Sequence, residues 1–224
     1  MVQKQDIFTV LGGRVKFGLG KYNPTCDAVW LAAFAARCGG KTILDAGIGT
    51  GGAALCLLEH APDLKITGID ISPQMLSECA QNAALNNREI ELINDDILTW
   101  RTDRTFDVVI TNPPYFKGTA RADNSHHNVN LNDWTRACLK RVRPMGSFYC
   151  IADAATAAEI IAALHSGKAG DISILPLFGN AKTAERVLIS ARLNSRGGTK
   201  IHAGLSMNDD SVLRDAKPLT SAKN

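Results

Sequence analysis

The residues best suited to chemistry are Asn112-Pro113-Pro114-Tyr115, which directly follow the apolar run 106–111. The amide oxygen of Asn112 and the main-chain carbonyl of Pro113 can each accept one N–H of a planar amino group. The nitrogen lone pair of such a group is delocalised into the attached π system. Hydrogen-bond acceptors that favour a tetrahedral nitrogen direct this lone pair at an electrophile. The prolines stiffen the segment, and Tyr115 offers a stacking face. We predict that Asn112, Pro113 and Tyr115 carry group transfer to an amide-type or exocyclic nitrogen, with a rigid turn as the structural alternative.

A glycine-rich turn lies between a strand pattern and a helix pattern, with the sequence Asp45-Ala46-Gly47-Ile48-Gly49-Thr50-Gly51-Gly52. Residues that lack Cβ suit a tight turn where a ligand approaches the backbone. The glycines also fit the dinucleotide fingerprint, so they alone do not separate a nicotinamide cofactor from S-adenosylmethionine, and a close helix–strand crossing is the structural alternative. Asp45 favours S-adenosylmethionine, because its carboxylate can neutralise the cationic amino-acid end of that molecule. A pyrophosphate would gain nothing from this acid.

Acidic residues also follow the next two expected strands. Asp70 stands about twenty residues after the glycines, where an acid accepts the two ribose hydroxyls of either cofactor class. After the third strand, we expect Asp96 rather than Asp95 to receive the adenine amino group, with Ile97 against the ring; an ordinary exposed turn explains either acid alone equally well. The expected cofactor-binding residues are Asp45, Gly47, Gly49, Gly51, Asp70, Ile71, Asp96, Ile97 and Asn112.

The elements that must position these residues alternate between strand and helix patterns. We expect strands at 42–46, 65–70, 90–94, 106–111 and 146–152, and helices at 52–60, 73–86, 130–142 and 154–166. This order predicts an α/β fold in which helices cover both faces of a mostly parallel sheet. The runs 171–177 and 186–193 leave no room for a crossover helix, so the last of seven strands should be antiparallel. A hairpin around Gly12-Gly13 and a helix beginning after Thr25 precede this core.

The 224 residues suit one α/β domain, expected over 1–207, with an N-terminal extension at 1–24, a core at 41–193 and a flexible tail at 208–224. The formal charge of +3 permits an RNA partner but does not require one. Neither a membrane-spanning run nor a signal peptide is expected, and six scattered cysteines without a C-x-x-C pair suit reduced thiols in the core. We therefore expect a cytoplasmic protein without membrane contact, with a monomer slightly favoured.

The motifs resemble those of the class I, Rossmann-like methyltransferases that depend on S-adenosylmethionine. Asp45 to Gly51 match the first motif of that family, and Asn112 to Tyr115 match its amino-methylating signature, within a resemblance that covers residues 41–193. The resemblance implies S-adenosylmethionine as cofactor and transfer of its methyl group to a planar nitrogen.

Within that superfamily, three stretches resemble the bacterial tRNA-valine adenine N6-methyltransferases, which act beside the anticodon: Leu11 to Arg14, Lys21 to Val29 and Asn112 to Phe116. This resemblance implies tRNA as partner and adenine N6 next to the anticodon as acceptor. The sequence departs from the family at Asn23, where an arginine is usual. The resemblance also implies that Asp27 lies near the cofactor entrance, although an acid in the first turn of a helix is an equally good explanation.

Two basic regions are candidates for holding RNA. Lys117 and Arg121 belong to the polar segment 117–129, where we expect them to hold phosphates, and His126 or His127 to stack on or pair with RNA. A solvated loop is the alternative, and no metal is expected at the histidines, because further ligands at suitable spacing are missing. Lys4, Arg14, Lys16 and Lys21 form the second region, which a solvated face also explains. The expected acceptor-binding residues are Pro114, Tyr115, Phe116, Lys117 and Arg121.

Other functions stay open. A protein glutamine N5-methyltransferase acts on the same kind of planar NH₂ group, although such enzymes usually carry an N-terminal helical domain that the residues before position 41 are too few to form. A DNA adenine or ribosomal guanine methyltransferase uses the same chemistry. An idle methyltransferase fold that binds RNA is disfavoured by intact Asp45, Asp70 and Asn112, and a dehydrogenase by the Asn112 to Tyr115 segment.

Overall fold

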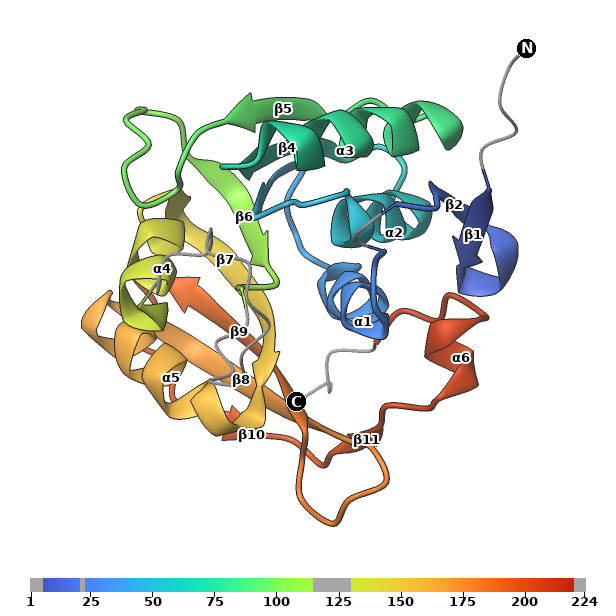
Figure 1. Cartoon of the computed structure of the whole chain (residues 1–224). Coiled ribbons are helices and arrows are strands. Elements are labelled where there is room, and N and C mark those ends of the chain that lie inside the picture. The colour runs from blue at the N-terminus through green and yellow to red at the C-terminus, as the bar shows by residue number, and fades with distance from the viewer. Residues whose placement is uncertain (1–5, 21–22, 115–129, 220–224) are drawn as a thin grey trace.

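The computed structural model describes residues 6–20, 23–114 and 130–219. One large sheet runs through these residues (Figure 1). Its longer strands are β3 (Thr42–Ala46), β4 (Lys65–Asp70), β5 (Glu91–Asn94), β6 (Phe106–Thr111), β7 (Val142–Asp153), β8 (Ala169–Phe178) and β9 (Arg186–Leu193). Their order is β8-β9-β7-β6-β3-β4-β5, in which β9 is antiparallel to both neighbours and the other pairs are parallel. The predicted seven-stranded sheet with an antiparallel last strand is confirmed.

Two short strands extend this sheet beyond the prediction. They are β10 (Lys200–Ile201) and β11 (Leu205–Ser206), and both pair parallel with β8. Each has two residues, which is too short for an alternating apolar pattern to mark a strand in the sequence. The described sheet therefore has nine strands.

Helices lie on both faces of the sheet, as predicted. They are α1 (Cys26–Ala35), α2 (Gly52–His60), α3 (Pro73–Leu85), α4 (Leu131–Leu139) and α5 (Ala157–Ser166). The first three share one hydrophobic core with the sheet, and α4 and α5 share the core on the other face (Figure 1). None of the helices in the described ranges is both long and apolar enough to cross a bilayer.

Side chains of the central strands alternate between the two cores. Ile43 and Val108 belong to the core of α1, α2 and α3, whereas Leu44 and Val109 belong to the core of α4 and α5. Because both faces are buried, the centres of β3 and β6 are apolar at consecutive positions, Ile43-Leu44 and Val108-Val109-Ile110, instead of alternating with polar residues. Their predicted bounds are confirmed for this reason, and those of α2 and β4 are confirmed as well.

The start of β7 was predicted wrongly. The expected strand covered 146–152, whereas the observed strand covers Val142–Asp153, and α4 consequently ends three residues before the predicted 142. The early part of the strand is not recognisable in the sequence, because residues 144–146 contain proline and glycine, which are rare inside strands. Met145 also has a left-handed φ of 63°. Val142 nevertheless pairs with Phe106 of β6.

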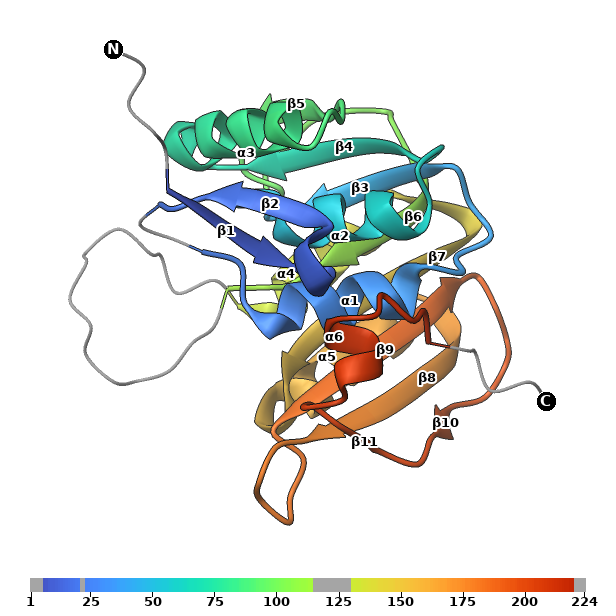
Figure 2. The same ribbon diagram turned by 90° about the vertical axis from the view of Figure 1, so that its right-hand side faces the viewer.

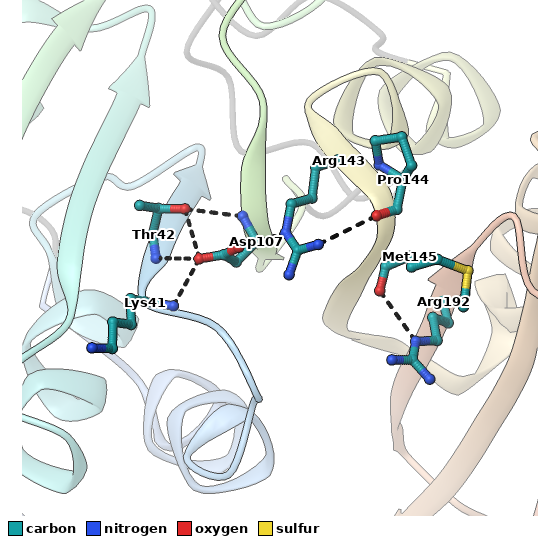
Figure 3. Close-up of polar contacts among 7 residues, drawn as sticks. All are labelled: Lys41, Thr42, Asp107, Arg143, Pro144, Met145 and Arg192. Carbon is teal, nitrogen blue, oxygen red and sulfur yellow. Dashed lines mark hydrogen bonds and ion pairs between the residues drawn. The ribbon is translucent and has the colours of Figure 1, made fainter.

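Asp107 joins three strands at the amino edge of the sheet (Figure 3). Its Oδ2 accepts hydrogen bonds from Lys41 N (2.8 Å), Thr42 N (2.9 Å) and Thr42 Oγ1 (3.0 Å), and its Oδ1 accepts from Arg143 Nε. The main-chain N–H groups of Thr42 and Lys41, and then Arg143, hold the pKa of Asp107 well below its usual range. These contacts link the starts of β3, β6 and β7, two of which carry the predicted site at their other ends.

We expect Asp107→Asn to lower the free energy of unfolding by about 1–3 kcal/mol at neutral pH, because donors at this edge lose a charged acceptor. Because the pKa is depressed, the ionised Asp107 stabilises the fold at every pH above its ordinary pKa of 3.8. This stabilisation is lost as the pH falls below 3.8 and through the depressed pKa. Urea unfolding from neutral to acidic pH should therefore show the difference from wild type shrinking in acid. Asp103→Asn, at an exposed position, is the control, and an equal loss in both variants would contradict the assignment.

The hairpin predicted around Gly12 is confirmed and lies beside α3 (Figure 2). It consists of β1 (Ile7–Val10) and β2 (Val15–Gly18). Asn86, which caps the C-terminal end of α3, makes two hydrogen bonds to the main chain of Lys16 (2.8 and 2.6 Å), and Asn82 Oδ1 of α3 accepts from Gly18 N (2.9 Å). The hairpin is thus held by side chains of α3 rather than by the large sheet.

Residues 207–219, the C-terminal strap, differ from the loose tail predicted from about residue 208. The strap contains α6 (Asp210–Leu213), whose Val212 is only 2% exposed. The indole N–H of Trp30 in α1 donates to the carbonyl of Met207 (3.2 Å). A polar composition suggested a tail, but α1 is buried along most of its length and the strap packs against it.

Four of the six cysteines are buried, which confirms them as small core residues: Cys56, Cys79, Cys138 and Cys150. Burial raises the pKa of the Cys56, Cys79 and Cys150 thiols to about 12. These side chains therefore stay neutral thiols at physiological pH.

Candidate active site

The glycine-rich turn joins the carboxyl end of β3 to α2. Gly47, Gly49 and Gly51 have φ values of 73°, 55° and 89°, in the left-handed region that favours glycine. The amides of Gly47 and Ile48 donate to the carbonyl of Ile69 on β4 (2.9 and 3.1 Å). A Cβ at Gly49 would meet no atom within 4 Å, so this part of the backbone faces open space. The turn therefore has room for a ligand at its main chain.

Asp45 lies next to this turn, near the end of β3, and is 2% exposed. Burial first, and then the nearby Asp70 carboxylate, raise its pKa to about 7, although a hydrogen bond from the Ala54 main chain acts in the opposite direction. Its Oδ2 is buried and has no hydrogen-bond partner among the described residues. A buried acceptor of this kind is costly unless a donor reaches it, and a cationic donor would stabilise it most.

Asn112 follows the end of β6, the strand that pairs with β3. Its Oδ1 is also buried, and the described part of the chain supplies no hydrogen-bond partner for it. Pro113 is buried and Pro114 is exposed, so the segment leaves the sheet immediately after Asn112. The predicted acceptor oxygen is therefore held at the carboxyl edge, and no donor within the described ranges competes for it.

One cavity of about 230 Å³ brings these features together. Asp45, Gly47, Gly49 and Asn112 line it, and it is completed by Asn23, Pro24, Thr25, Ala28, Ile48, Thr50, Gly52, Ala53 and Met75. Two buried oxygens that have no partner in the part of the chain described, from Asp45 and Asn112, thus belong to residues of a single cavity at the carboxyl edge of the sheet. This is where ligands of open α/β sheets bind.

Asp70 supports the turn from the end of β4. Its Oδ2 accepts from Gly49 N (2.9 Å) and its Oδ1 from Ser72 N (2.9 Å). Ser72 caps α3 by accepting from the amide of Met75 (3.3 Å). Each carboxylate oxygen keeps a lone pair, so it can still accept a hydrogen bond from a ribose hydroxyl. Ile71 is 63% exposed beside Asp70 and offers an apolar face at the same edge.

Asp96 and Ile97 follow the end of β5. Asp96 Oδ1 accepts from Leu98 N (2.9 Å), and Asp95 Oδ1 accepts from Asp96 N (2.7 Å). Ile97 is 4% exposed and packs in the core that contains Trp100. Neither Asp96 nor Ile97 is among the residues that line the cavity, so their contact with an adenine ring stays a prediction.

The sequence profile of the methyltransferase small domain family matches residues 25–164, which is more than half of the 224 residues. This chain belongs to the methyltransferase small domain family. The match includes the glycine-rich turn, Asp70 and Asn112. The family match therefore includes most of the residues that line the cavity, Asp45 and Asn112 among them.

Curated relatives of this family member include two kinds of named methyltransferase. The tRNA1(Val) (adenine(37)-N6)-methyltransferase of Glaesserella parasuis is 28% identical over 129 residues, which cover 54% of each chain. That of Pseudoalteromonas translucida is 34% identical over 46% of this chain and 45% of the relative. The release factor glutamine methyltransferase of Lactococcus lactis is 39% identical over 37% of this chain and 31% of the relative. The chain thus spans about half the length, or less, of these relatives.

Solved structures share the fold of this family member. A predicted O-methyltransferase from Agrobacterium tumefaciens has a TM-score of 0.70 and 24% identity, over 88% of this chain and 99% of that one. A 16S rRNA N2 G1207 methyltransferase from T. thermophilus, in complex with AdoMet and guanosine, has a TM-score of 0.60 and 18% identity, over 85% and 50%. These likenesses confirm the class I methyltransferase fold.

The described residues fit S-adenosylmethionine as the cofactor. Asp45 provides a buried carboxylate for the ammonium, the bare backbone at Gly49 leaves room for close approach, and Asp70 has lone pairs for a ribose. Each of these features is an unfilled interaction that the amino-acid and nucleoside parts of this molecule can complete.

Several predicted residues lie outside the described residues. They are Tyr115, Phe116, Lys117, Arg121, His126 and His127 in the segment after Pro114, and Lys4 and Lys21 near the N-terminus. Their roles stay predictions. Of the basic N-terminal residues that are described, Arg14 donates to the carbonyl of Arg214 in the strap (3.1 Å).

Asp27 lies at the carboxyl edge and is paired with an arginine. It is 3% exposed, and its Oδ2 accepts from Arg186 Nε (3.1 Å) at the start of β9. Arg186 also lies 3.8 Å from Asp153 at the end of β7. The next residue, Ala28, lines the cavity, which agrees with the implied position of Asp27 near the cofactor entrance. The Asp27 side chain itself forms a buried ion pair with Arg186.

Sequence reasoning missed part of the cavity lining. Asn23, Pro24, Thr25 and Met75 lie in it, although none was predicted as a site residue. The first three belong to the stretch that resembles the tRNA methyltransferases, and this stretch was the available signal. A larger hollow of about 530 Å³ lies at the amino edge of the sheet, near Thr67 and Arg104, away from every site residue named above.

Proposed function

We propose that this chain transfers a methyl group from S-adenosylmethionine to an exocyclic amino group, adenine N6 of a tRNA next to the anticodon. The observation that carries the proposal is the buried Asn112 Oδ1, which lacks a partner within the described residues and belongs to the same cavity as Asp45. The relatives named tRNA1(Val) (adenine(37)-N6)-methyltransferase support the choice of acceptor. Action on tRNA implies a cytoplasmic protein.

Asn112 and Pro113 prepare the nucleophile in this proposal. The Asn112 amide oxygen and the Pro113 carbonyl accept the two N–H groups of adenine N6 and favour a tetrahedral nitrogen. When bound, the cofactor supplies an electrophilic methyl group on a sulfonium. The nitrogen forms a bond to the methyl carbon as the sulfur–carbon bond breaks, and one N–H proton then leaves to water. No general base is needed before transfer.

The acceptor must leave its base stack to reach this cavity, because the amino group inside a stacked loop cannot align with the sulfonium. Tyr115 is the predicted stacking partner for the flipped base. Pro114, Phe116, Lys117 and Arg121 are proposed to contact the acceptor around it. Asp45 and Asp70 are proposed to hold the ammonium and the ribose of the cofactor, with Ile71, Asp96 and Ile97 at the adenine.

The cofactor affinity of this site should depend on pH through Asp45. Its pKa is raised to about 7, and only the ionised carboxylate pairs with an ammonium. Affinity for S-adenosylmethionine is therefore expected to increase between about pH 5.5 and about pH 7, by up to about tenfold per unit, while the α-amino group stays protonated. Calorimetric titration across this range measures the slope. Asp45→Asn should flatten it, and an equally steep slope in that variant would remove Asp45 from the role.

Labelled product identifies the acceptor. Purified protein is incubated with methyl-labelled S-adenosylmethionine and either tRNA or protein extract from a strain that lacks the gene, and products are identified by mass spectrometry. N6-methyladenosine next to the anticodon is the expected result. Label in protein glutamine would replace it with the second candidate, which the Lactococcus lactis relative supports. Cofactor binding without label in either extract would contradict both acceptors.

A further inference from the structure

Thr111 and Trp134 form a buried hydrogen-bond relay beneath the candidate site. The indole Nε1 of Trp134 donates to Thr111 Oγ1 (3.0 Å), and Thr111 Oγ1 donates to the carbonyl of Ala46 (2.8 Å). Thr111 is 1% exposed and Trp134 is 8% exposed. Thr111 directly precedes Asn112, and Ala46 directly precedes Gly47. The relay therefore joins the last residue before the acceptor segment to the last residue before the cofactor turn.

The indole also touches the cofactor turn directly. A Cβ placed on Gly47 would lie 3.2 Å from Cη2 and Cζ2 of Trp134, so the ring packs closely against the Gly47 backbone. The same side chain thus contacts the turn with its ring and holds the Asn112 segment through Thr111. This arrangement adds a cross-link between β3 and β6 beyond the pairing of Ala46 with Thr111 in the sheet.

The start of α4 fixes the indole in this position. Asn130 caps the helix by accepting from Asn132 N (2.8 Å), and the Trp134 amide donates to the Asn130 carbonyl (2.9 Å). The ring packs in the hydrophobic core together with Leu44 and Ala46. A capped helix and a packed ring leave the indole N–H little freedom, so the relay is rigid on its α4 side.

We propose that Thr111 and Trp134 are positioning residues that set the distance between the Asn112 amide and the cofactor turn. They touch neither substrate nor cofactor in this role. Methyl transfer requires near-linear alignment, and small misplacements of a reacting group cost up to about a hundredfold in rate. The inference rests on the proposed function, because its rate readout is methyl transfer.

The first test compares substitutions that differ only in the relay. Thr111→Val keeps the volume of the side chain and removes the hydroxyl, so kcat should fall about ten- to a hundredfold with an unchanged dissociation constant for S-adenosylmethionine. Thr111→Ser keeps the hydroxyl and should restore most of kcat, although it removes a buried methyl group. Thr135→Val is the matched control, since Thr135 is equally buried on α4 and bonds to neither motif within the described residues. An equal loss of kcat in the control would overturn the proposal.

A double substitution separates positioning from general damage. If Thr111 acts through Asn112, then Thr111→Val should cause no further loss of kcat in an Asn112→Ala background. Multiplicative losses would overturn the proposal. Trp134→Phe keeps a ring but lacks the donor, so it should show the same loss of kcat and the same unchanged cofactor affinity as Thr111→Val. If Trp134→Phe does not fold, Thr111→Val alone tests the relay.

Hydrogen exchange of the Trp134 indole N–H tests the relay without an acceptor. Exchange should be slow in wild type and in Thr111→Ser, and faster in Thr111→Val. Equal rates in wild type and Thr111→Val would overturn the relay whatever the substrate. If wild type methylates protein instead of tRNA, the proposed acceptor fails, and the rate comparison is made with that protein. If wild type methylates neither, the proposed function fails and the exchange result alone decides the relay.

Discussion

Asn112→Ala is expected to fold and to bind S-adenosylmethionine as wild type does, yet to lose about 10²- to 10³-fold in kcat. The side chain supplies an acceptor oxygen, Oδ1, that is buried and has no partner among the described residues, so removing this oxygen breaks no hydrogen bond within them. In the proposed reaction the same oxygen holds an N–H of the acceptor and orients the nitrogen lone pair. The loss should therefore fall on the chemical step rather than on cofactor binding.

Single-turnover kinetics with excess enzyme measure this step, and calorimetry measures cofactor binding. Asn132→Ala is the control, because Asn132 is similarly half-buried on α4 and lies outside the cavity. Asn112→Asp keeps an acceptor oxygen in the same place and should retain more turnover than Asn112→Ala. Turnover in Asn112→Ala equal to wild type would exclude Asn112 from the proposed role.

Asp45→Asn should change cofactor affinity and stability in opposite directions. Loss of a charge-assisted pair with the ammonium is expected to weaken binding of S-adenosylmethionine by about 1.5–3 kcal/mol, which is roughly 10- to 150-fold. Without cofactor, the variant should be more stable than wild type near about pH 8. The pKa of Asp45 is raised from 3.8 to about 7, so its ionisation costs stability that is intact below 3.8 and is lost as pH rises through about 7.

Calorimetric titration and urea unfolding of the cofactor-free protein measure these two quantities. Asp63→Asn is the control for removal of a carboxylate at an exposed position, and it should change neither. A variant that loses both stability and affinity would indicate that Asp45 is mainly a structural residue of the turn. Unchanged affinity would show that the ammonium binds elsewhere.

The sheet was predictable where burial on both faces leaves no ambiguity. The centres of β3 and β6 are apolar at consecutive positions, Ile43-Leu44 and Val108-Val109-Ile110, so both strands could be recognised in the sequence. The first residues of β7 were not predictable in this way, because Pro144 and Gly146 resemble a turn and only pairing with β6 makes them a strand. The strap was missed because its own composition is polar, although the apolar circumference of α1 already indicated that another segment must cover it.

The candidate site was predictable where a short sequence motif contains the residues that form it. Gly47, Gly49, Asp45 and Asn112 follow from local motifs, and the structure places them around one cavity. The Thr111–Trp134 relay was not predictable, since its partners are separated by 23 residues and meet only through tertiary packing. The assignments to Tyr115 and Arg121 stay predictions, because these residues lie outside the described ranges.

The C-terminal strap also has a consequence for synthesis on the ribosome. The hydrogen bond from Trp30 to Met207 joins residues that are 177 positions apart. Until residues 207–219 have been made, the outer side of α1 has no cover from the strap, so the nascent chain carries an exposed apolar surface for most of its translation. Contacts of such long range also slow folding. Chaperones that recognise apolar helices should therefore bind this chain early in translation and release it only after residues 207–219 have been synthesised and have packed against α1.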